Sequence, residues 1–199
     1  MSSRLVRRRF LATAITVAAA FAAGLSSGAT TSALAAACPP PPTPVYAFPD
    51  DQTEYVMTTG GAFGAGSPAW TLTGGAARVA DQAPDPFAPA SSTGALYLPP
   101  GSSATSPCVT APGIVGWVRL YAKSVGALDG RLSVQIIVHG TAYAAGTVAP
   151  GAGWGATPLL RSDAPLYKGA VTYQVRLTPV GPGAAFNVDD AWIDPLMHR

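Results

Sequence analysis

The sequence has few residues that could serve as acid–base catalysts, since it contains only two histidines, His139 and His198. After residue 35 it also lacks the Gly-x-Ser-x-Gly, His-Glu-x-x-His and glycine-rich phosphate-loop motifs, which position a nucleophile, a zinc ion or a nucleotide. A lone histidine without a triad is more often a surface residue than a catalyst. These absences favour a binding or structural protein over an enzyme, and a hydrolase with an unrecognised site stays open as an alternative.

Residues 1–35 have the order of a cleavable secretory signal, which is a charged start, an apolar run and small residues. The start carries Arg4, Arg7, Arg8 and Arg9, and the stretch from Phe10 to Leu25 contains no charge. The apolar run is shorter than the ~20 residues of a transmembrane helix and is broken by Thr and Gly, so no anchor is expected after processing. Cleavage after Ala35 leaves eight basic and ten acidic residues, a net charge of −2. No basic stripe remains for nucleic acid.

The export route has two interpretations. Arg7-Arg8-Arg9-Phe10-Leu11 matches the core of a twin-arginine signal, and it also fits an ordinary arginine-rich n-region. A lipoprotein is a third interpretation because Cys38 follows an Ala-rich stretch, although Leu34 lies one position too far back for a good lipobox. The expected location is extracellular in each case.

Cysteine is nearly absent, with only Cys38 and Cys108 in the whole chain. In an oxidising compartment two cysteines predict one disulfide. This bond would tie the start of the mature chain to the body of the domain. A metal or catalytic role is disfavoured because the two cysteines lack paired ligand spacing.

The mature chain divides into an extended Pro-rich segment, 36–53, and an all-β domain, 54–199. The prolines at 39–42 and 44 cannot form helix or central strand. Period-two alternation predicts strands at 117–122, 131–139 and 171–178. Weaker strands are expected at 54–58, 70–73, 76–80, 95–98, 103–109, 142–148, 154–160 and 185–193. Many short strands separated by Gly and Pro turns predict an antiparallel β-sandwich, or jelly roll.

Three segments in order resemble the galactose-binding-like jelly rolls of carbohydrate-binding modules. They are Gly60-Gly61-Ala62-Phe63 followed by Trp70, the run from Trp117 to Lys123, and the run from Phe186 to Trp192. Gly74-Gly75-Ala76 and the stretch 102–109 also resemble a set of secreted actinobacterial proteins. The resemblance implies a non-catalytic module that binds a glycan, and a structural calcium ion. It places a carboxylate ligand of the calcium ion at Asp189 or Asp190. The glutamate expected after Phe63 is replaced by Gly64, which removes one of the six to eight oxygen ligands that calcium prefers.

The side chains predicted to face solvent on the three clearest strands suggest one binding face. If those strands are sheet neighbours, aromatic rings and hydrogen-bonding groups converge, and such a surface suits the apolar face and hydroxyl rim of a sugar. The candidate ligand-binding residues are Trp117, Arg119, Tyr121, Gln135, Gln174 and Arg176, with Arg131 and His139 beside them. Cross-strand pairs of this kind also stabilise ordinary solvent-facing sheets. A structural or interaction protein of the cell envelope with no small ligand therefore remains an alternative. Trp70, Trp154 and Trp192 are expected to be core or loop anchors.

Overall fold

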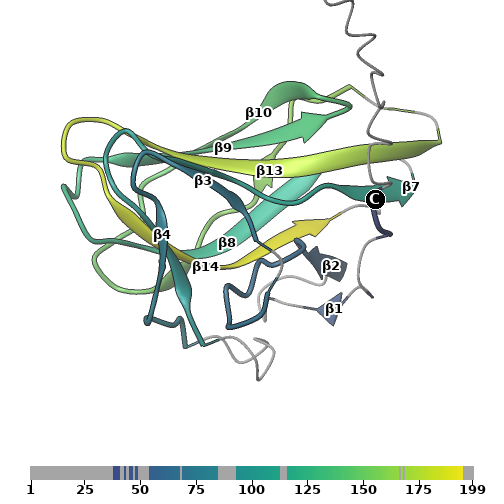
Figure 1. Ribbon diagram of the computed structural model, residues 1–199. Helices are drawn as coiled ribbons and strands as arrows, with labels where there is room; N and C mark the ends of the chain where they lie inside the picture. Colours follow the sequence, from purple (N-terminus) through teal and green to yellow (C-terminus); the bar gives the residue numbers. More distant parts are fainter. Residues whose placement is uncertain are drawn as a thin grey trace, which may run out of the picture. The chain divides into compact units, whose positions relative to one another are not determined.

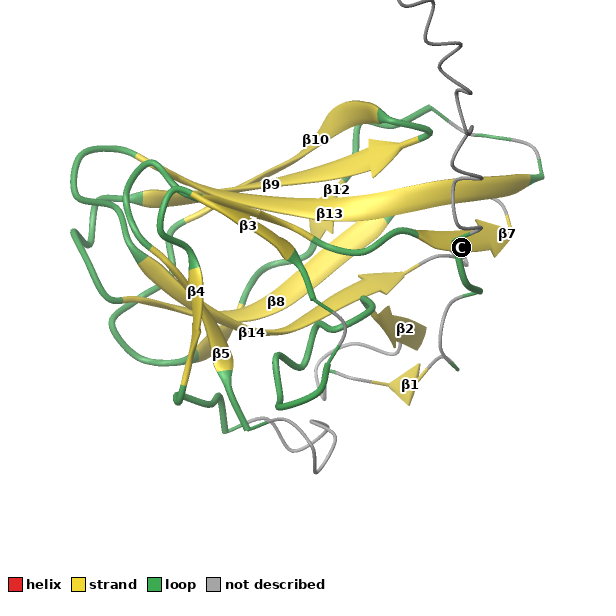
Figure 2. Cartoon of the chain, in the orientation of Figure 1, coloured by secondary structure: helices red, strands yellow, loops and turns green. Residues whose placement is uncertain are grey.

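The computed structural model describes residues 38–40, 43, 45–46, 48, 54–67, 69–84, 93–112, 116–165, 167 and 169–194. The chain divides into residues 1–35 and 36–199, and every described residue belongs to the second unit. The predicted signal peptide, its twin-arginine motif and His198 therefore lie outside the described residues. Within them every regular element is a strand (Figure 2). In the part of the chain so described, no helix is both long and apolar enough to cross a membrane.

The strands form two antiparallel sheets, drawn in Figure 1. The β14 sheet has the order β1-β2-β14-β5-β4, with β8 on the other edge of β14 and with β11 and β12 paired to β8. Its strands are β1 Val45–Tyr46, β2 Glu54–Met57, β4 Ala77–Val79, β5 Ala95–Leu98, β8 Trp117–Ser124, β11 Gly155–Ala156, β12 Leu160–Arg161 and β14 Phe186–Asp194. The β13 sheet has the order β10-β9-β13-β6-β3, with β7 also paired to β13. Its strands are β3 Thr71–Thr73, β6 Ser103–Thr105, β7 Val109–Pro112, β9 Arg131–Val138, β10 Thr141–Val148 and β13 Ala170–Val180.

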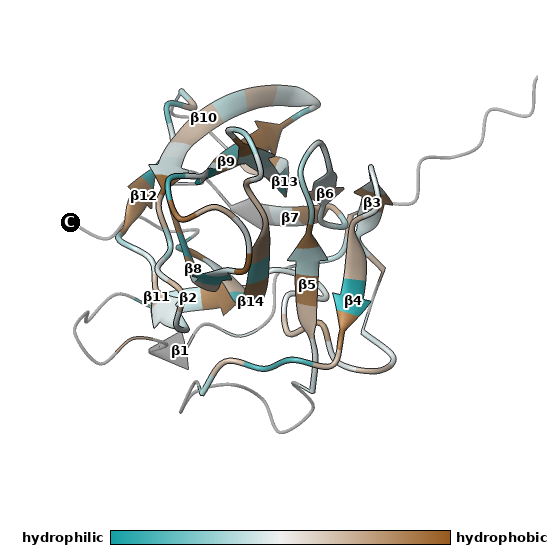
Figure 3. Cartoon of the chain, turned by 90° about the vertical axis from the view of Figure 1, so that its left-hand side faces the viewer, coloured by the Kyte–Doolittle hydropathy of each residue, from teal (hydrophilic) through white to brown (hydrophobic). Residues whose placement is uncertain are grey.

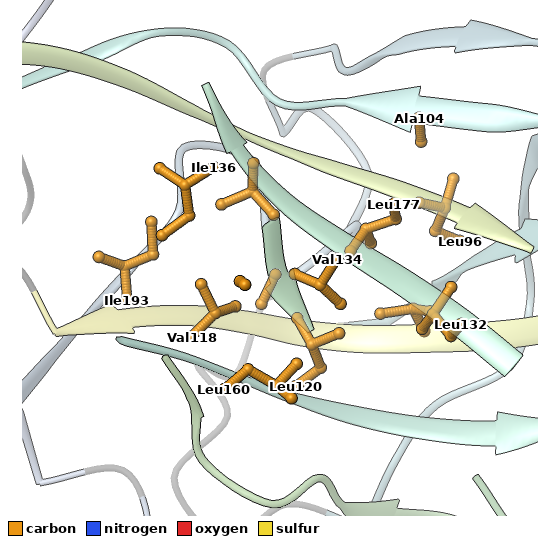
Figure 4. Packing of buried hydrophobic residues seen from close by; sticks show 14 of the residues in the cluster. Leu96, Ala104, Val118, Leu120, Leu132, Val134, Ile136, Leu160, Leu177 and Ile193 are labelled. Carbon is orange, nitrogen blue, oxygen red and sulfur yellow. The ribbon is translucent and has the colours of Figure 1, made fainter. Parts of the chain in front are cut away.

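The two sheets pack face to face through one apolar core, in two layers that are visible edge-on in Figure 3. Val118, Leu120 and Ile193 come from the β14 sheet, and Val134 and Leu177 come from the β13 sheet; all five are fully buried. Figure 4 shows these side chains meeting between the strands. Val134 and Leu177 each lie between two polar residues, so period-two patterning sorts β9 and β13 into a core face and an outer face.

The chain crosses between the sheets repeatedly, as in a jelly roll. It passes from β5 to β6, from β7 to β8, from β8 to β9 and from β13 to β14, changing sheet each time. The β8–β9 and β13–β14 crossings lie side by side, since Val125 and Ala127 donate backbone hydrogen bonds to Ala185 and Gly183. Gly126 is required there, because a Cβ atom would lie 2.3 Å from the Gly183 carbonyl oxygen.

The structure confirms the predicted all-β antiparallel sandwich and its principal strands. Two of the weaker predicted strands are each split in two: 103–109 into β6 and β7, and 154–160 into β11 and β12. Pro107 and Pro158 lie between the halves and lack the N–H that a continuous ladder needs. Val45–Tyr46, which the sequence places in the extended segment, pairs with β2 as a short strand.

His139 does not belong to a strand. Strand β9 ends at Val138, and His139 with Gly140 forms the two-residue turn into β10, with φ values of 48° and 82°. Two consecutive positive φ angles are typical of the type I′ hairpin turn. The position is therefore determined by turn geometry, and the histidine is exposed.

Candidate functional site

A polar depression of about 520 Å³ lies on the outer face of the β13 sheet. We call it the polar depression, and it is lined by Thr71, Thr73, Gly101, Ser102, Ser103, Thr105, Gln135, Arg176 and Thr178. All of these except the glycine have a hydroxyl, amide or guanidinium side chain, and no aromatic ring or carboxylate occurs in this set of described residues. The depression is thus a surface of hydrogen-bond donors and acceptors.

The lining residues form rows because the strands are in register. Gln135 on β9 is opposite Arg176 on β13, Arg176 is opposite Thr105 on β6, and Thr105 is opposite Thr71 on β3. Directly opposite side chains on one face lie about 5 Å apart. The four side chains therefore form one line across four strands.

Two hydrogen bonds fix the orientation of parts of these rows. The Arg176 Nε–H donates to the Thr105 hydroxyl oxygen at 3.2 Å. In the neighbouring row the hydroxyls of Thr73 and Ser103 are 2.8 Å apart and share a hydrogen bond. Arg176 is half-buried, so its guanidinium is held along the sheet surface while part of it remains open to solvent.

Gln135 and Arg176 are the two predicted ligand-binding residues that the structure places together in the depression. Gln174 lies on the same face but does not line it. Its side-chain amide donates to the Ser106 carbonyl oxygen at 2.8 Å, and the Ser106 hydroxyl accepts from Val175 N–H at 2.9 Å. These bonds anchor the segment that joins β6 to β7 onto β13.

The prediction that one surface unites the candidate residues is wrong. Trp117, Arg119 and Tyr121 lie on β8 in the β14 sheet, whereas Gln135 and Arg176 lie in the β13 sheet. The outer faces of the two layers of a sandwich point in opposite directions, with the core between them. Strands β8 and β9, which follow each other in the chain, are therefore not neighbours in one sheet.

The outer face around Arg119 and Tyr121 is also covered. Phe48 is 1% exposed; its ring stacks on Tyr121 with centroids 5.6 Å apart, and the Arg119 guanidinium carbon lies 4.0 Å from its centroid. Tyr55 and Trp192 complete this second apolar cluster, and both are buried. These rings therefore contribute packing contacts and do not form an open platform for a sugar.

A polar cluster at the other end of the same face anchors the segment after β4. The Asp81 carboxylate forms an ion pair with Lys123 at 2.9 Å and accepts a hydrogen bond from the Asn187 amide. Lys123 Nζ also lies 4.9 Å from the centroid of the Trp154 ring. Burial raises the pKa of Asp81, but hydrogen bonds from Lys123, Asn187 and Trp154 and the Lys123 charge outweigh it, so the pKa is lowered below 3.8.

The three tryptophans expected to be core or loop anchors differ in their burial. Trp70 and Trp192 are buried, at 5% and 3% exposed, and the Trp70 indole N–H donates to the Thr59 carbonyl oxygen at 3.1 Å. Trp154 is half-buried. A stabilising role therefore fits Trp70 and Trp192 better than ligand stacking.

Asp189 and Asp190 are both fully buried on β14. A register irregularity opposite β8 follows Asp189, and Asp190 has a φ of 46°, so a β-bulge breaks the strand's alternation there. The two oxygens of Asp189 accept N–H groups from Ala83 and Asp190, each at 2.9 Å. Asp189 therefore anchors the main chain through both of its carboxylate oxygens.

No group of three or more His, Cys, Asp and Glu side chains in the described part of the chain is arranged to hold a metal ion. The calcium site stays a prediction. His139 was considered in the sequence analysis as an acid–base group. Its Nδ1 shares a hydrogen bond with the Thr172 hydroxyl at 3.3 Å, and its ring contacts the ring of Tyr167.

Sequence reasoning did not name the hydroxyl residues of the depression. Thr71 and Thr73 flank Leu72, and Ser103 and Thr105 flank Ala104, so these two short strands carry the same alternation as the long ones. That pattern is the signal that could have found them. A smaller pocket of about 320 Å³, bounded mainly by Gly, Ala, Pro and Thr of residues 147–160, was not foreseen either.

The chain is similar in fold to several carbohydrate-binding modules of known structure. The family 61 module TmCBM61, solved with β-1,4-galactotriose, has a TM-score of 0.43 and 14% identity, over 64% of this chain and 88% of that one. The C-terminal family 22 module of Clostridium thermocellum Xyn10B has a TM-score of 0.42 and 15% identity, over 70% and 92%. A Clostridium thermocellum family 11 module, solved with a β-1,3-1,4-mixed-linked tetrasaccharide, has a TM-score of 0.35 and 8% identity, over 78% and 96%.

The ligands named for these structures are properties of those proteins. No protein-family model matches the chain, and no curated protein matches it significantly.

Proposed function

We propose that this chain is a secreted, non-catalytic binding module that recognises a carbohydrate through the polar depression. The observation that carries the proposal is the line Gln135, Arg176, Thr105 and Thr71, which crosses four strands in register. Sugars present hydroxyl groups at regular spacing, and each hydroxyl can both donate and accept. A row of hydroxyl, amide and guanidinium groups matches that pattern.

The dimensions support a ligand of several sugar rings. The depression of about 520 Å³ is within the range of small-molecule sites, which is about 300–1,000 Å³. It is an open surface on a rigid sheet, so little reorganisation is needed on binding. Its lining set in the described chain has no carboxylate or histidine, which supports binding without acid–base chemistry.

Secretion is supported by the signal-like start of the chain and by the disulfide between Cys38 and Cys108. Disulfides persist in oxidising compartments and are rare in the cytosol. N-terminal sequencing of exported protein tests this part of the proposal, and a start near residue 36 is the expected result.

Binding is tested by glycan-array screening followed by affinity electrophoresis in polysaccharide gels. Gln135→Ala and Thr105→Val remove hydrogen-bonding groups from the row, and each should reduce retardation by the polysaccharide. Arg161→Ala is a matched control, because Arg161 is exposed on β12 of the other sheet. Binding that survives both row substitutions contradicts the choice of face. A protein that binds no glycan at all would favour the structural role at the cell envelope.

A further inference from the structure

The β13 sheet has an unusual charge composition. Its six described strands contain no aspartate or glutamate, and their only charged residues are Arg131 and Arg176. The mature chain has more acidic than basic residues, so this face differs in sign from the rest of the protein. Potentials of opposite sign steer ligands to such a surface.

Arg176 lies within the depression, and its hydrogen bond to Thr105 uses only part of its bonding capacity. Its Nε–H donates to Thr105, and a guanidinium has five N–H donors in all. Among the described residues no carboxylate forms an ion pair with Arg176; Asp81, for comparison, pairs with Lys123 of the other sheet. The terminal nitrogens are therefore available for an oxyanion such as a carboxylate or a sulfate, which can bind a guanidinium in a bidentate manner.

The residue types that line the depression limit which interactions can contribute to its affinity for a ligand. No aromatic ring occurs among the described residues of the depression, so the stacking of a ring on an apolar sugar face does not contribute. Affinity must come from polar groups, and a neutral hydroxyl bond to water-accessible Thr or Ser adds little. A charge-assisted bond to half-buried Arg176 adds more, since partial burial weakens screening by solvent.

We propose that the ligand is an acidic polysaccharide, whose sugar carboxylate or sulfate group pairs with Arg176 while Gln135 and Thr105 bind adjacent hydroxyls. This inference rests on the proposed function and names the class of its ligand. The neighbours suit these roles because Gln135 and Thr105 are the direct cross-strand partners of Arg176, one on each side.

The test compares polysaccharides that share a backbone and differ in charge. Affinity electrophoresis and calorimetry use polygalacturonate against its fully methyl-esterified form, alginate and hyaluronan as further carboxylate chains, and dextran sulfate against dextran. The first comparison reports carboxylate recognition and the last reports sulfate recognition. We expect one charged form to bind at least about tenfold more tightly than its neutral partner.

The variants separate specific pairing from general attraction. Arg176→Gln should lower that affinity about tenfold, and Arg176→Lys should restore only part of it because an ammonium cannot make the bidentate contact. Arg161→Gln removes the same charge from the other sheet and should change the affinity less than twofold. An equal loss in Arg176→Gln and Arg161→Gln would show nonspecific attraction and would overturn the inference.

The two proposals fail in different ways. Equal binding of charged and neutral forms, still weakened by Gln135→Ala, overturns the acidic ligand and leaves carbohydrate binding standing. Absence of binding to every polysaccharide, neutral or charged, overturns both. Circular dichroism and melting of each variant confirm that the fold is retained.

Discussion

The Arg119 guanidinium carbon lies 4.0 Å from the centroid of the Phe48 ring, and the same ring stacks on Tyr121. Phe48 comes from the segment before β2, whereas Arg119 and Tyr121 belong to β8. The N-terminal segment therefore covers the outer face of the β14 sheet with an aromatic side chain. Arg119 Nε also donates to the Thr157 carbonyl oxygen at 3.1 Å, which fixes the guanidinium beneath the ring.

Phe48→Ala should lower the free energy of unfolding by about 3 kcal/mol, because it removes a buried ring and leaves Tyr121 and Arg119 exposed. Urea denaturation measures the change. Phe48→Leu serves as the control, and it should cost less because it keeps much of the apolar contact. An unchanged midpoint for Phe48→Ala would show that the ring does not pack on β8.

Removal of the disulfide should destabilise the domain by up to ~4 kcal/mol, since the bond joins cysteines 70 residues apart and restricts the unfolded chain. The paired change Cys38→Ser with Cys108→Ser should melt at the same temperature with and without dithiothreitol. The unaltered protein should lose stability only in the reductant. Equal melting of both proteins in oxidising buffer would contradict a stabilising role. Thr110 still donates hydrogen bonds to the carbonyl oxygens of residues 38 and 39, so the attachment of this segment to β7 should persist in part.

Stability should fall at acid pH through Asp81. The pKa of Asp81 is lowered in the folded state, so its stabilisation is present above the unfolded value of 3.8 and is lost as the pH falls through the folded-state pKa. Asp81→Asn should be less stable near neutral pH and should flatten the decline in melting temperature below about pH 4. Asp129→Asn, at an exposed site in the β8–β9 crossing, is the control. An identical decline in Asp81→Asn and the unaltered protein would exclude Asp81 as a contributor.

Tyr173→Phe should stabilise the protein by about 1 kcal/mol. Tyr173 is 1% exposed on β13, and its hydroxyl has no hydrogen-bond partner among the described residues. Burial raises the pKa of Tyr173, which reflects the same desolvated position. Removing the hydroxyl therefore removes a desolvation penalty. Tyr143→Phe provides the contrast, because the Tyr143 hydroxyl bonds to that of Tyr167 at 3.0 Å and its loss should destabilise.

Calcium should raise the melting temperature if Asp190 contributes a ligand as the resemblance implies. Thermal melts in calcium and in EDTA measure the effect, and Asp190→Asn should abolish the difference between them. Asp189→Asn should destabilise in both buffers, because its oxygens hold backbone N–H groups. Identical melts of the unaltered protein in both buffers would exclude a stabilising calcium ion.

Alternation in the sequence was sufficient to predict the principal strands. On β9 and β13 the residues Val134, Ile136, Val175 and Leu177 are buried, and each is flanked by a polar residue on at least one side. A chain with this pattern can bury its apolar set only by presenting the other set on the opposite face. Local patterning therefore determined which side chains face outward in these strands, including Gln135 and Arg176.

Only the tertiary structure decided which outward-facing residues lie on the same sheet and which of these sheet faces are covered by other segments. Strands β8 and β9 follow each other in the chain, yet the crossing at Gly126 places Arg119 and Gln135 in different sheets. The sequence also does not show that Phe48 returns across β8, because that contact joins residues about seventy positions apart. Alternation is a local property with a period of two residues, whereas strand order and covering contacts depend on long-range packing.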